Sequence, residues 1–242
     1  MKRTIGLDRE LKLRWMDVGA GLAQVERDKL NLRARLMEAL AADIPAYYVR
    51  VKTCTVLIRT WWMVPAEQVE LRERAFDLLK TVAPGQRLAT HWGMLLLAYP
   101  FFREVVSAIG RAAAMQETVN RGQASRKIIE TWGERTTVKR SILRVFQTLT
   151  GWNILVSSNG TQDTFRTAPS QLISDVSLAL WMAEVIIHAR GTAVSFSVLA
   201  QPPEYFPFRL GLTLADITQS GRFETFREGP ELLVGTRGLD RH

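Results

Sequence analysis

A short segment in the middle of the chain carries a dense set of cationic side chains. Residues 121–144 hold seven basic residues against Glu130 and Glu134, a balance of +5 in a chain whose total is +8. Guanidinium and ammonium groups pair with phosphate oxygens, so this concentration predicts a surface that binds a polyanion such as nucleic acid. The alternative is a solvated helix surface whose positive charge is balanced by acidic groups elsewhere in the fold. The seven residues are Arg121, Arg126, Lys127, Arg135, Lys139, Arg140 and Arg144.

The remaining charge is distributed unevenly. Residues 1–60 carry 12 basic and 7 acidic side chains, again a balance of +5, and the rest of the chain outside the two basic segments sums to −2. The C-terminal residues 171–242 are net acidic, so they are not expected to lie on a phosphate backbone and instead suit a partner protein.

Apolar spacing in residues 125–149 predicts two helices joined by a tight turn. Ser125 is expected to cap the first helix and Gly133 to end it, because serine favours N-caps and glycine favours the residue after a helix. Thr136 or Thr137 is expected to cap the second helix. Its buried side is one apolar stripe with helical spacing, made of Val138, Ile142, Val145, Phe146 and Leu149.

The opposite face of this second helix has the chemistry of a DNA-recognition helix. Such a helix enters the major groove with its N-terminal residues nearest the bases, so a basic face and a polar first turn are expected. Arg140 and Arg144 are the first candidates for bidentate contacts with guanine or phosphate. The predicted contact residues from this helix and its entry are Arg135, Thr136, Thr137, Lys139, Arg140, Arg144 and Gln147.

Short strand signals flank the two helices. A first strand is expected at residues 117–119, and residues 154–156 and 164–166 are expected to pair through a type I′ turn at Asn159-Gly160. The order strand, helix, turn, helix, hairpin predicts a winged helix-turn-helix. Asn159 at its tip and Arg166 on its returning strand are predicted DNA contacts, and Arg121, Arg126 and Lys127 are predicted to add contacts to the DNA backbone.

The rest of the chain predicts a mainly α fold in three parts. A helical N-terminal domain is expected at residues 1–87, the winged helix-turn-helix domain at 88–170, and a C-terminal α/β extension at 171–242. Residues 49–62 are ambiguous between a strand and a buried helix. The helical pattern of residues 88–115 is expected to kink or break at Pro100. In the extension, a buried helix is expected at 172–188 and two short strands within 222–234.

Catalytic and ligand-binding signals are weak. The single cysteine, Cys54, excludes an internal disulfide and a thiolate zinc cluster, and the three histidines lack the spacing of a metal-binding helix. His91 is expected in the core. We find no phosphate loop and no nucleophile elbow. The sequence therefore predicts no catalytic residue, metal, cofactor or small-molecule substrate, although an enzyme whose acidic and histidine groups meet only in the folded chain stays an alternative.

The sequence also shows no sign of membrane insertion. The longest apolar run, residues 94–102, is too short to span a bilayer, and no apolar stretch follows the charges at the N-terminus. A cytoplasmic protein is expected.

One resemblance to a known family accompanies this pattern. The buried helix around Phe101-Phe102-Arg103-Glu104, followed by the stretch from Thr137-Val138-Lys139-Arg140 to Leu155, resembles the BrxA-type accessory proteins of BREX phage-defence systems. The similarity covers residues 88–156, and this chain is longer at its C-terminus. It implies a winged helix that binds duplex DNA inside an antiviral defence complex and has no activity of its own.

Together these patterns predict a non-catalytic protein that binds double-stranded DNA. It would serve as an accessory subunit of a phage-defence or other DNA-processing complex, or as a transcriptional regulator. A protein partner or a homo-oligomer is also expected, with one of the neighbours Trp61 and Trp62 at an interface. The alternative is a scaffold subunit whose winged helix docks a partner protein instead of DNA.

Overall fold

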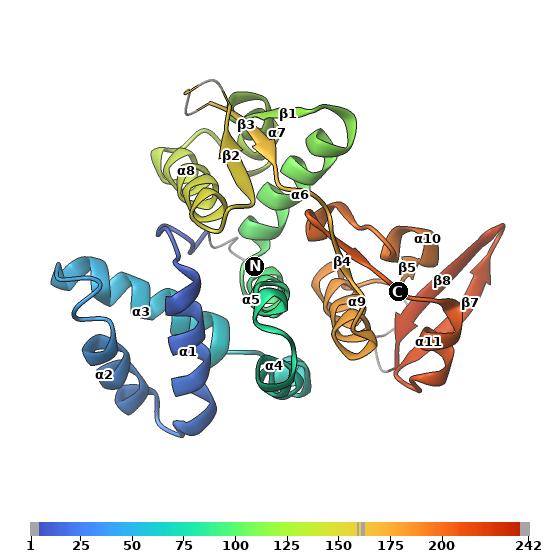
Figure 1. The fold of residues 1–242 in the computed structure, drawn as a ribbon, viewed down its shortest axis with the longest axis horizontal. Coiled ribbons are helices and arrows are strands. Elements are labelled where there is room, and N and C mark those ends of the chain that lie inside the picture. Colours follow the sequence, from blue (N-terminus) through green and yellow to red (C-terminus); the bar gives the residue numbers. More distant parts are fainter. Residues whose placement is uncertain (1–4, 159, 161–162, 238–242) are drawn as a thin grey trace.

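The computed structural model describes residues 5–158, 160 and 163–237 (Figure 1). The predicted mainly α class is confirmed, since helices make up every element as far as residue 115. Short 3-10 turns, η1 (Ala66–Gln68) and η2 (Pro84–Gln86), precede α4 and α5. The first helices are α1 (Leu13–Val25), α2 (Lys29–Ala39), α3 (Tyr47–Trp61), α4 (Val69–Thr81), α5 (Arg87–Ala98) and α6 (Pro100–Met115).

Of the ambiguous residues 49–62, all but the last are helical, within α3. Cys54, Leu57 and Trp61 are buried on one side of this helix, which packs against α1 and α2. Burial on a helical face thus overrides the strand preference of its β-branched residues. Trp61 lies in the core, where its ring stacks on that of Phe76 with the centroids 5.5 Å apart.

The predicted break at Pro100 is confirmed. Tyr99 adopts an extended conformation between α5 and α6, and Pro100 is the first residue of α6, where its missing N–H costs no hydrogen bond. The break lets the two helices follow different directions, and buried side chains extend along both of them.

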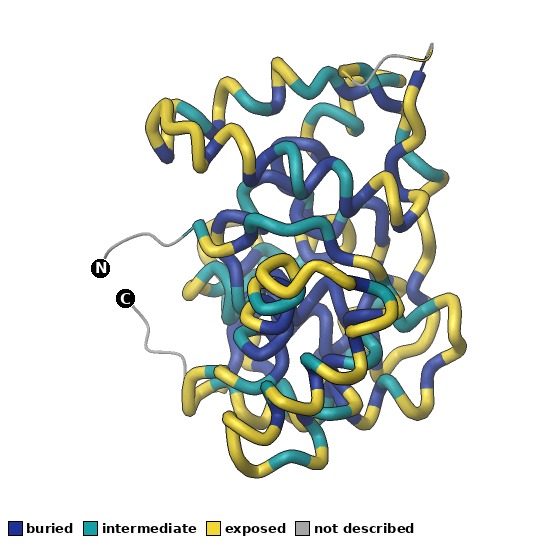
Figure 2. Tube along the Cα trace, turned by 90° about the vertical axis from the view of Figure 1, so that its left-hand side faces the viewer, coloured by how far each residue is buried: buried dark blue, intermediate teal, exposed yellow. Residues whose placement is uncertain are grey.

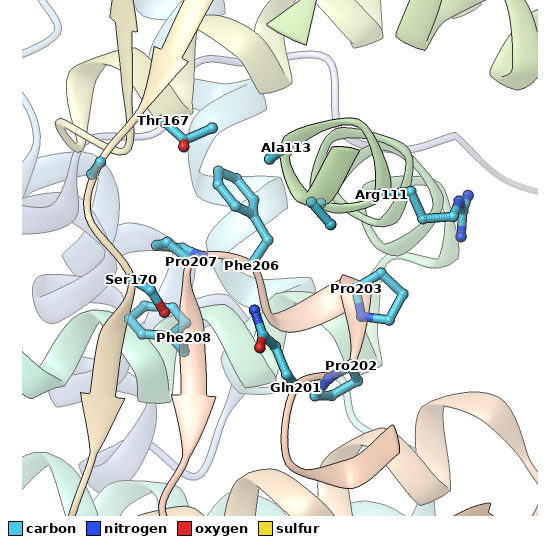
Figure 3. A pocket seen from close by; sticks show the side chains of 13 residues that line it. Arg111, Ala113, Thr167, Ser170, Gln201, Pro202, Pro203, Phe206, Pro207 and Phe208 are labelled. Carbon is cyan, nitrogen blue, oxygen red and sulfur yellow. The ribbon is translucent and has the colours of Figure 1, made fainter. Parts of the chain in front are cut away.

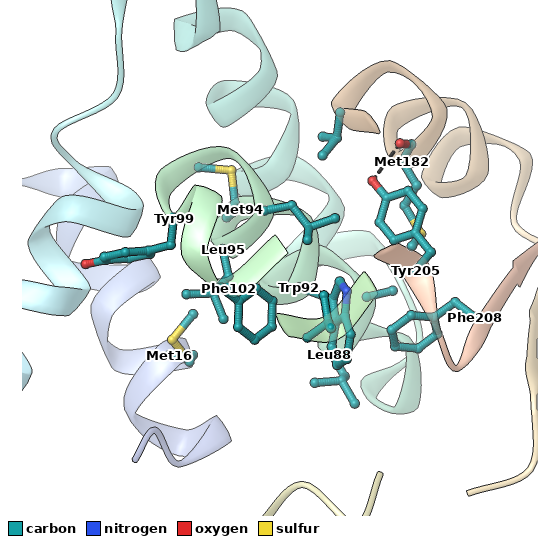
Figure 4. Close-up of a cluster of buried hydrophobic side chains, with 14 of the residues drawn as sticks. Met16, Leu88, Trp92, Met94, Leu95, Tyr99, Phe102, Met182, Tyr205 and Phe208 are labelled. Carbon is teal, nitrogen blue, oxygen red and sulfur yellow. Dashed lines mark hydrogen bonds between the residues drawn. The ribbon is translucent and has the colours of Figure 1, made fainter. Parts of the chain in front are cut away.

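One core joins the parts of the chain. Trp92 of α5 is fully buried, its Nε1 donates to the carbonyl of Glu204 at 2.8 Å, and its ring lies 5.6 Å from that of Phe208. Met16 of α1 and Met182, far along the chain, line the same cluster (Figure 4). Buried positions gather in the interior and exposed ones at the periphery (Figure 2). The domain boundaries after residues 87 and 170 remain predictions, and buried side chains from both sides of each belong to one cluster.

The middle of the chain builds three helices and a small sheet. After α6 come β1 (Thr118–Asn120), α7 (Arg121–Trp132), α8 (Thr136–Gly151), β2 (Leu155–Ser157) and β3 (Thr164–Thr167). The helices α6, α7 and α8 pack against one another. The strands form an antiparallel sheet in the order β1-β3-β2, so the short predicted strands are confirmed.

The predicted two-residue turn of the hairpin is wrong. Ser157 pairs with Phe165, and the N–H of Ser158 donates to the carbonyl of Thr164 at 2.8 Å. Residues 158–163 therefore separate β2 from β3. Burial of Phe165 determines this register, because a shift by one residue would turn its ring to solvent. Gly160 has φ +68°, and Asn159 lies outside the described residues.

The C-terminal part mixes helices and strands, as predicted. β4 (Gln171–Ile173) and β6 (Phe208–Leu210) pair in parallel, and β5 (Val194–Ser195), β8 (Glu231–Thr236) and β7 (Phe223–Glu228) form an antiparallel sheet in that order. The helical elements are α9 (Val176–Arg190), α10 (Phe196–Leu199), η3 (Pro203–Tyr205) and α11 (Leu214–Gln219). In the described part of the chain, no helix combines the length and apolarity needed to cross a bilayer.

The helix expected at residues 172–188 is α9, which begins only at Val176. Asp175 caps it, because the Asp175 carboxylate accepts a hydrogen bond from the N–H of Leu178 at 2.9 Å. The residues before this cap pair with β6 as a strand. The two strands expected within 222–234 are confirmed as β7 and β8.

Candidate nucleic-acid interface

The first helix of the basic segment, α7, begins earlier than predicted. The side-chain oxygen of Asn120 accepts a hydrogen bond from the N–H of Gln123 at 3.1 Å, so Asn120 caps the helix and Arg121 is its first residue. Ser125 is not the cap. Its hydroxyl lies inside α7 and donates to the carbonyl of Arg121 at 2.7 Å. Gly133, with φ +82°, ends the helix as predicted.

The second helix, α8, begins at Thr136, and neither threonine caps it. Arg135 occupies the N-cap position, and among the described residues no side chain accepts a bond there. The Arg135 guanidinium instead donates to the carbonyl of Trp132 at 2.9 Å, which closes the turn between the helices. The predicted apolar stripe of α8 is confirmed, because all five of its members are at most 2% exposed: Val138, Ile142, Val145, Phe146 and Leu149.

The other side of α8 is polar and cationic. Thr136, Thr137, Lys139 and Arg140 are exposed, and the Arg140 guanidinium forms no hydrogen bond or ion pair with the described part of the chain. The Nζ of Lys139 lies 2.6 Å from a carboxylate oxygen of Glu134 in the turn. This face therefore presents its charges to solvent, with one of them paired to an exposed acid.

The last two predicted residues of this helix, Arg144 and Gln147, lie at the edge of that face. Both are half-buried, and the Arg144 guanidinium donates to the Gln147 side-chain oxygen at 2.8 Å. Their hydrogen bond holds the guanidinium beside the helix. Arg140 is thus the more available of the two arginines singled out from the sequence.

The hairpin contributes further cations. Arg166 is exposed on β3, and its guanidinium forms no hydrogen bond or ion pair within the described residues; the same holds for the guanidinium of Arg126 on α7. The side chain of Arg121 already has an acidic partner, because its guanidinium donates to the Asp163 carboxylate at 2.5 Å. This pair ties the start of α7 to the residue before β3.

Lys127 lies apart from the face of α8. It lines a cavity of about 290 Å³ together with Arg103 and Arg111 of α6 and Glu204 of η3. The structure therefore groups Lys127 with α6 and with one acidic residue of the C-terminal part, and not with the face of α8. No sequence signal indicates this, since Arg126 and Lys127 are neighbours in one basic run.

A cleft that sequence reasoning missed lies between α8 and α3. Its volume is about 550 Å³, and it brings Lys52 of α3 and Asp8 together with Arg135, Thr137 and Arg140. The excess of basic residues in 1–60 is the one sequence signal that bears on it. That signal does not say which helix lies beside α8.

Another cavity, of about 450 Å³, lies between α6 and residues 201–208 (Figure 3). Phe206, Phe208 and three prolines contribute to its walls, and Arg111 is the titratable side chain among its lining residues. The arrangement offers a mostly apolar hollow without a pair of groups for acid–base chemistry.

His91 is confirmed as a core residue. It is 0% exposed, and its Nε2 lies 3.0 Å from a carboxylate oxygen of Asp17. An ionised carboxylate only accepts, so the imidazole donates from Nε2. Burial lowers the pKa of His91, and the hydrogen bond from His91 lowers the pKa of Asp17. Among the described residues no group of three or more His, Cys, Asp or Glu side chains could hold a metal ion.

Comparison of the chain with protein-family models, with curated proteins and with solved structures found no match.

Proposed function

We propose that this protein binds double-stranded DNA, with α6 to β3 acting as a winged helix-turn-helix and α8 as its recognition helix. The order of elements supports the proposal: a helix, a short strand, two helices joined by a tight turn, and a hairpin whose returning strand pairs with the first strand. A recognition helix of this class lies in the major groove while flanking groups contact the backbone.

The observation that carries the proposal is the division of α8 into two faces. The apolar stripe is buried, while Thr136, Lys139 and Arg140 are exposed on the other side. No described residue accepts from the Arg140 guanidinium, and a guanidinium suits both guanine edges and phosphate oxygens. Arg126 and Arg166 would add contacts to the backbone from α7 and from the wing.

The proposal assigns no catalytic step to the chain. A role as an accessory subunit in phage defence, which the resemblance to BrxA-type proteins implies, stays a prediction, as do the transcriptional regulator and the cytoplasmic location. DNA binding itself is the part that the arrangement of side chains supports.

The test is a titration of labelled duplexes of unrelated sequence, followed by fluorescence anisotropy, from about 50 mM to about 200 mM salt. Affinity should fall steeply with salt, because bound phosphates release counterions. The double variant Lys139→Ala/Arg140→Ala should reduce the slope of log affinity against log salt by about 0.9 for each phosphate that the variant no longer neutralises. Its melting temperature should stay unchanged, because both side chains are exposed.

Two results would contradict the proposal. One is an affinity for duplex DNA that the double variant leaves intact. The other is an absence of duplex binding at physiological salt by the unaltered protein. Stable co-purification with a protein partner in that second case would favour the docking scaffold.

A further inference from the structure

Resting on the proposed function, we propose that the cleft between α3 and α8 holds the phosphate backbone of the same duplex that α8 enters. The N-terminal helices would then be part of the DNA interface, although the sequence places them in a separate domain. The starting observation is that residues 1–60 have a net charge of +5. A DNA interface made by α8 alone would leave this second concentration of positive charge without a role.

The two walls of the cleft carry the same pair of side-chain types. On α8, Thr137 and Arg140 are three residues apart, and on α3, Lys52 and Thr55 are also three residues apart. Residues at this spacing lie on one face of a helix. Each wall therefore offers one cation, and Thr137 adds a hydroxyl group on α8, whereas the Thr55 hydroxyl donates to the carbonyl of Val51 at 2.9 Å.

The charge of the lining favours an anion. The described lining residues include three cations and one carboxylate, that of Asp8. The cations are Lys52, Arg135 and Arg140. The Asp8 oxygen and the Lys52 Nζ are 3.6 Å apart, and both side chains are partly exposed, so the pair is weak and leaves Lys52 able to meet a phosphate. A confined surface of one sign concentrates the opposite charge near it.

The cleft is continuous with the recognition face, because Arg140 belongs to both. When α8 lies in the major groove, one sugar–phosphate backbone of the duplex therefore lies at the opening of the cleft. A small-molecule ligand is less suited, since the cleft is open and Ile5 and Val56 are its large apolar lining residues.

The wall formed by α3 is connected to α8 through the residues that precede α1, since α1 packs on α3. The N–H of Leu11 donates to the Thr148 hydroxyl of α8 at 3.0 Å, and the Tyr99 hydroxyl donates to the carbonyl of Val56 at 3.2 Å. The Arg59 guanidinium lies 4.9 Å from the centre of the Tyr99 ring. The helices that carry the cations of the two walls are thus in place before a ligand arrives, which lowers the entropic cost of binding.

The test compares two matched lysines. Lys52 and Lys80 both lie on helices, with side chains 55% and 56% exposed, and each pairs with an aspartate at 3.6 Å and 3.1 Å. Only Lys52 lines the cleft. Lys52→Ala should lower duplex affinity by about tenfold near 50 mM salt and reduce the salt slope by about 0.9, whereas Lys80→Ala should change neither.

The outcomes separate this proposal from the one on which it rests. If Lys52→Ala matches Lys80→Ala while Lys139→Ala/Arg140→Ala weakens binding, the cleft is not a phosphate site and α8 remains the DNA contact. If neither Lys52→Ala nor the α8 double variant alters duplex binding, both proposals are wrong. A charge reversal, Lys52→Glu, should weaken binding more than Lys52→Ala, and an equal effect would contradict an electrostatic role.

Discussion

Lys139 and Glu134 meet at the entrance of α8, with the ammonium nitrogen 2.6 Å from a carboxylate oxygen and both side chains largely exposed. The hydrogen bond from Lys139 lowers the pKa of Glu134, so this carboxyl is ionised at neutral pH. An exposed pair of this kind is weak, because water screens both charges. A phosphate can therefore replace Glu134 as the partner of Lys139.

This relationship predicts that Glu134→Gln raises duplex affinity a few-fold at low salt, since it frees Lys139 and removes one repulsive charge. Anisotropy titrations measure the change. Glu73→Gln is the matched control, because Glu73 pairs with Arg72 at the same 2.6 Å distance on α4, away from α8. Equal effects of the two substitutions would show that Lys139 is not a DNA contact.

The exposed arginine of the hairpin gives a second prediction. Arg166→Ala should reduce the salt slope of duplex binding by about 0.9 and leave the melting temperature unchanged, because the side chain has no partner within the described residues. Arg227→Ala is the control, since Arg227 is also exposed on a strand, β7, in the C-terminal sheet. If Arg227→Ala alters the salt slope and Arg166→Ala does not, the DNA-binding surface lies in the C-terminal part and not on the hairpin.

The contact between α6 and the C-terminal part gives a third prediction. A Cβ on Gly110 would lie 2.2 Å from the carbonyl oxygen of Pro203, a distance that backbone atoms do not tolerate. Gly110→Ala should therefore lower the free energy of unfolding by about 1–3 kcal/mol, measured by urea denaturation.

The helical control for that substitution is Gly21→Ala. A Cβ on Gly21 meets nothing within 4 Å, and alanine favours a helix over glycine by about 1 kcal/mol. Gly21→Ala should therefore leave stability unchanged or raise it. If Gly110→Ala behaves like Gly21→Ala, η3 does not rest on α6 in solution.

Buried His91 predicts a dependence of stability on pH. Burial lowers its pKa in the folded state below the ordinary 6.5, against the opposing effect of Asp17. As pH falls through 6.5, the unfolded chain binds a proton that the folded chain does not, so the free energy of unfolding decreases. Chemical denaturation at about pH 7.5 and about pH 5.5 measures this decrease.

The variant His91→Gln should show a smaller decrease in stability over that pH range, whatever its absolute stability. Burial also lowers the pKa of His188, but this residue is only half-buried. His188→Gln should therefore remove a smaller part of the pH-dependent loss of stability than His91→Gln. An unchanged pH dependence in His91→Gln would mean that the imidazole binds a proton equally well in the folded and the unfolded chain, which would contradict the lowered pKa.

The local pattern of residues was enough to predict several elements. The spacing of Val138, Ile142 and Leu149 predicts the buried face of α8 correctly, because a helix with an apolar stripe must turn that stripe inward. Pro100 and Gly133 end helices for reasons of backbone geometry that act within a few residues. The short strands on either side of the two helices follow from similarly local signals.

Details that depend on competing neighbours were not predictable in this way. Asn120 caps α7 in place of Ser125, and both residue types favour caps, so only the position of β1 decides between them. The register of the hairpin likewise depends on the burial of Phe165 against α8, where its ring lies 5.3 Å from that of Phe146. Residues 49–62 became a helix because α1 and α2 cover one of their sides.

The sequence by itself determined which residues of the basic segment point outward and which point into the core, since that choice depends on periodicity along one helix. Only the tertiary structure decided which surfaces lie side by side. It brought Lys52 and Arg140 to one cleft, and Lys127 and Glu204 to one cavity. Neighbours of this kind result from how whole helices pack against each other, and that packing depends on the combined shape of many side chains far apart in the chain.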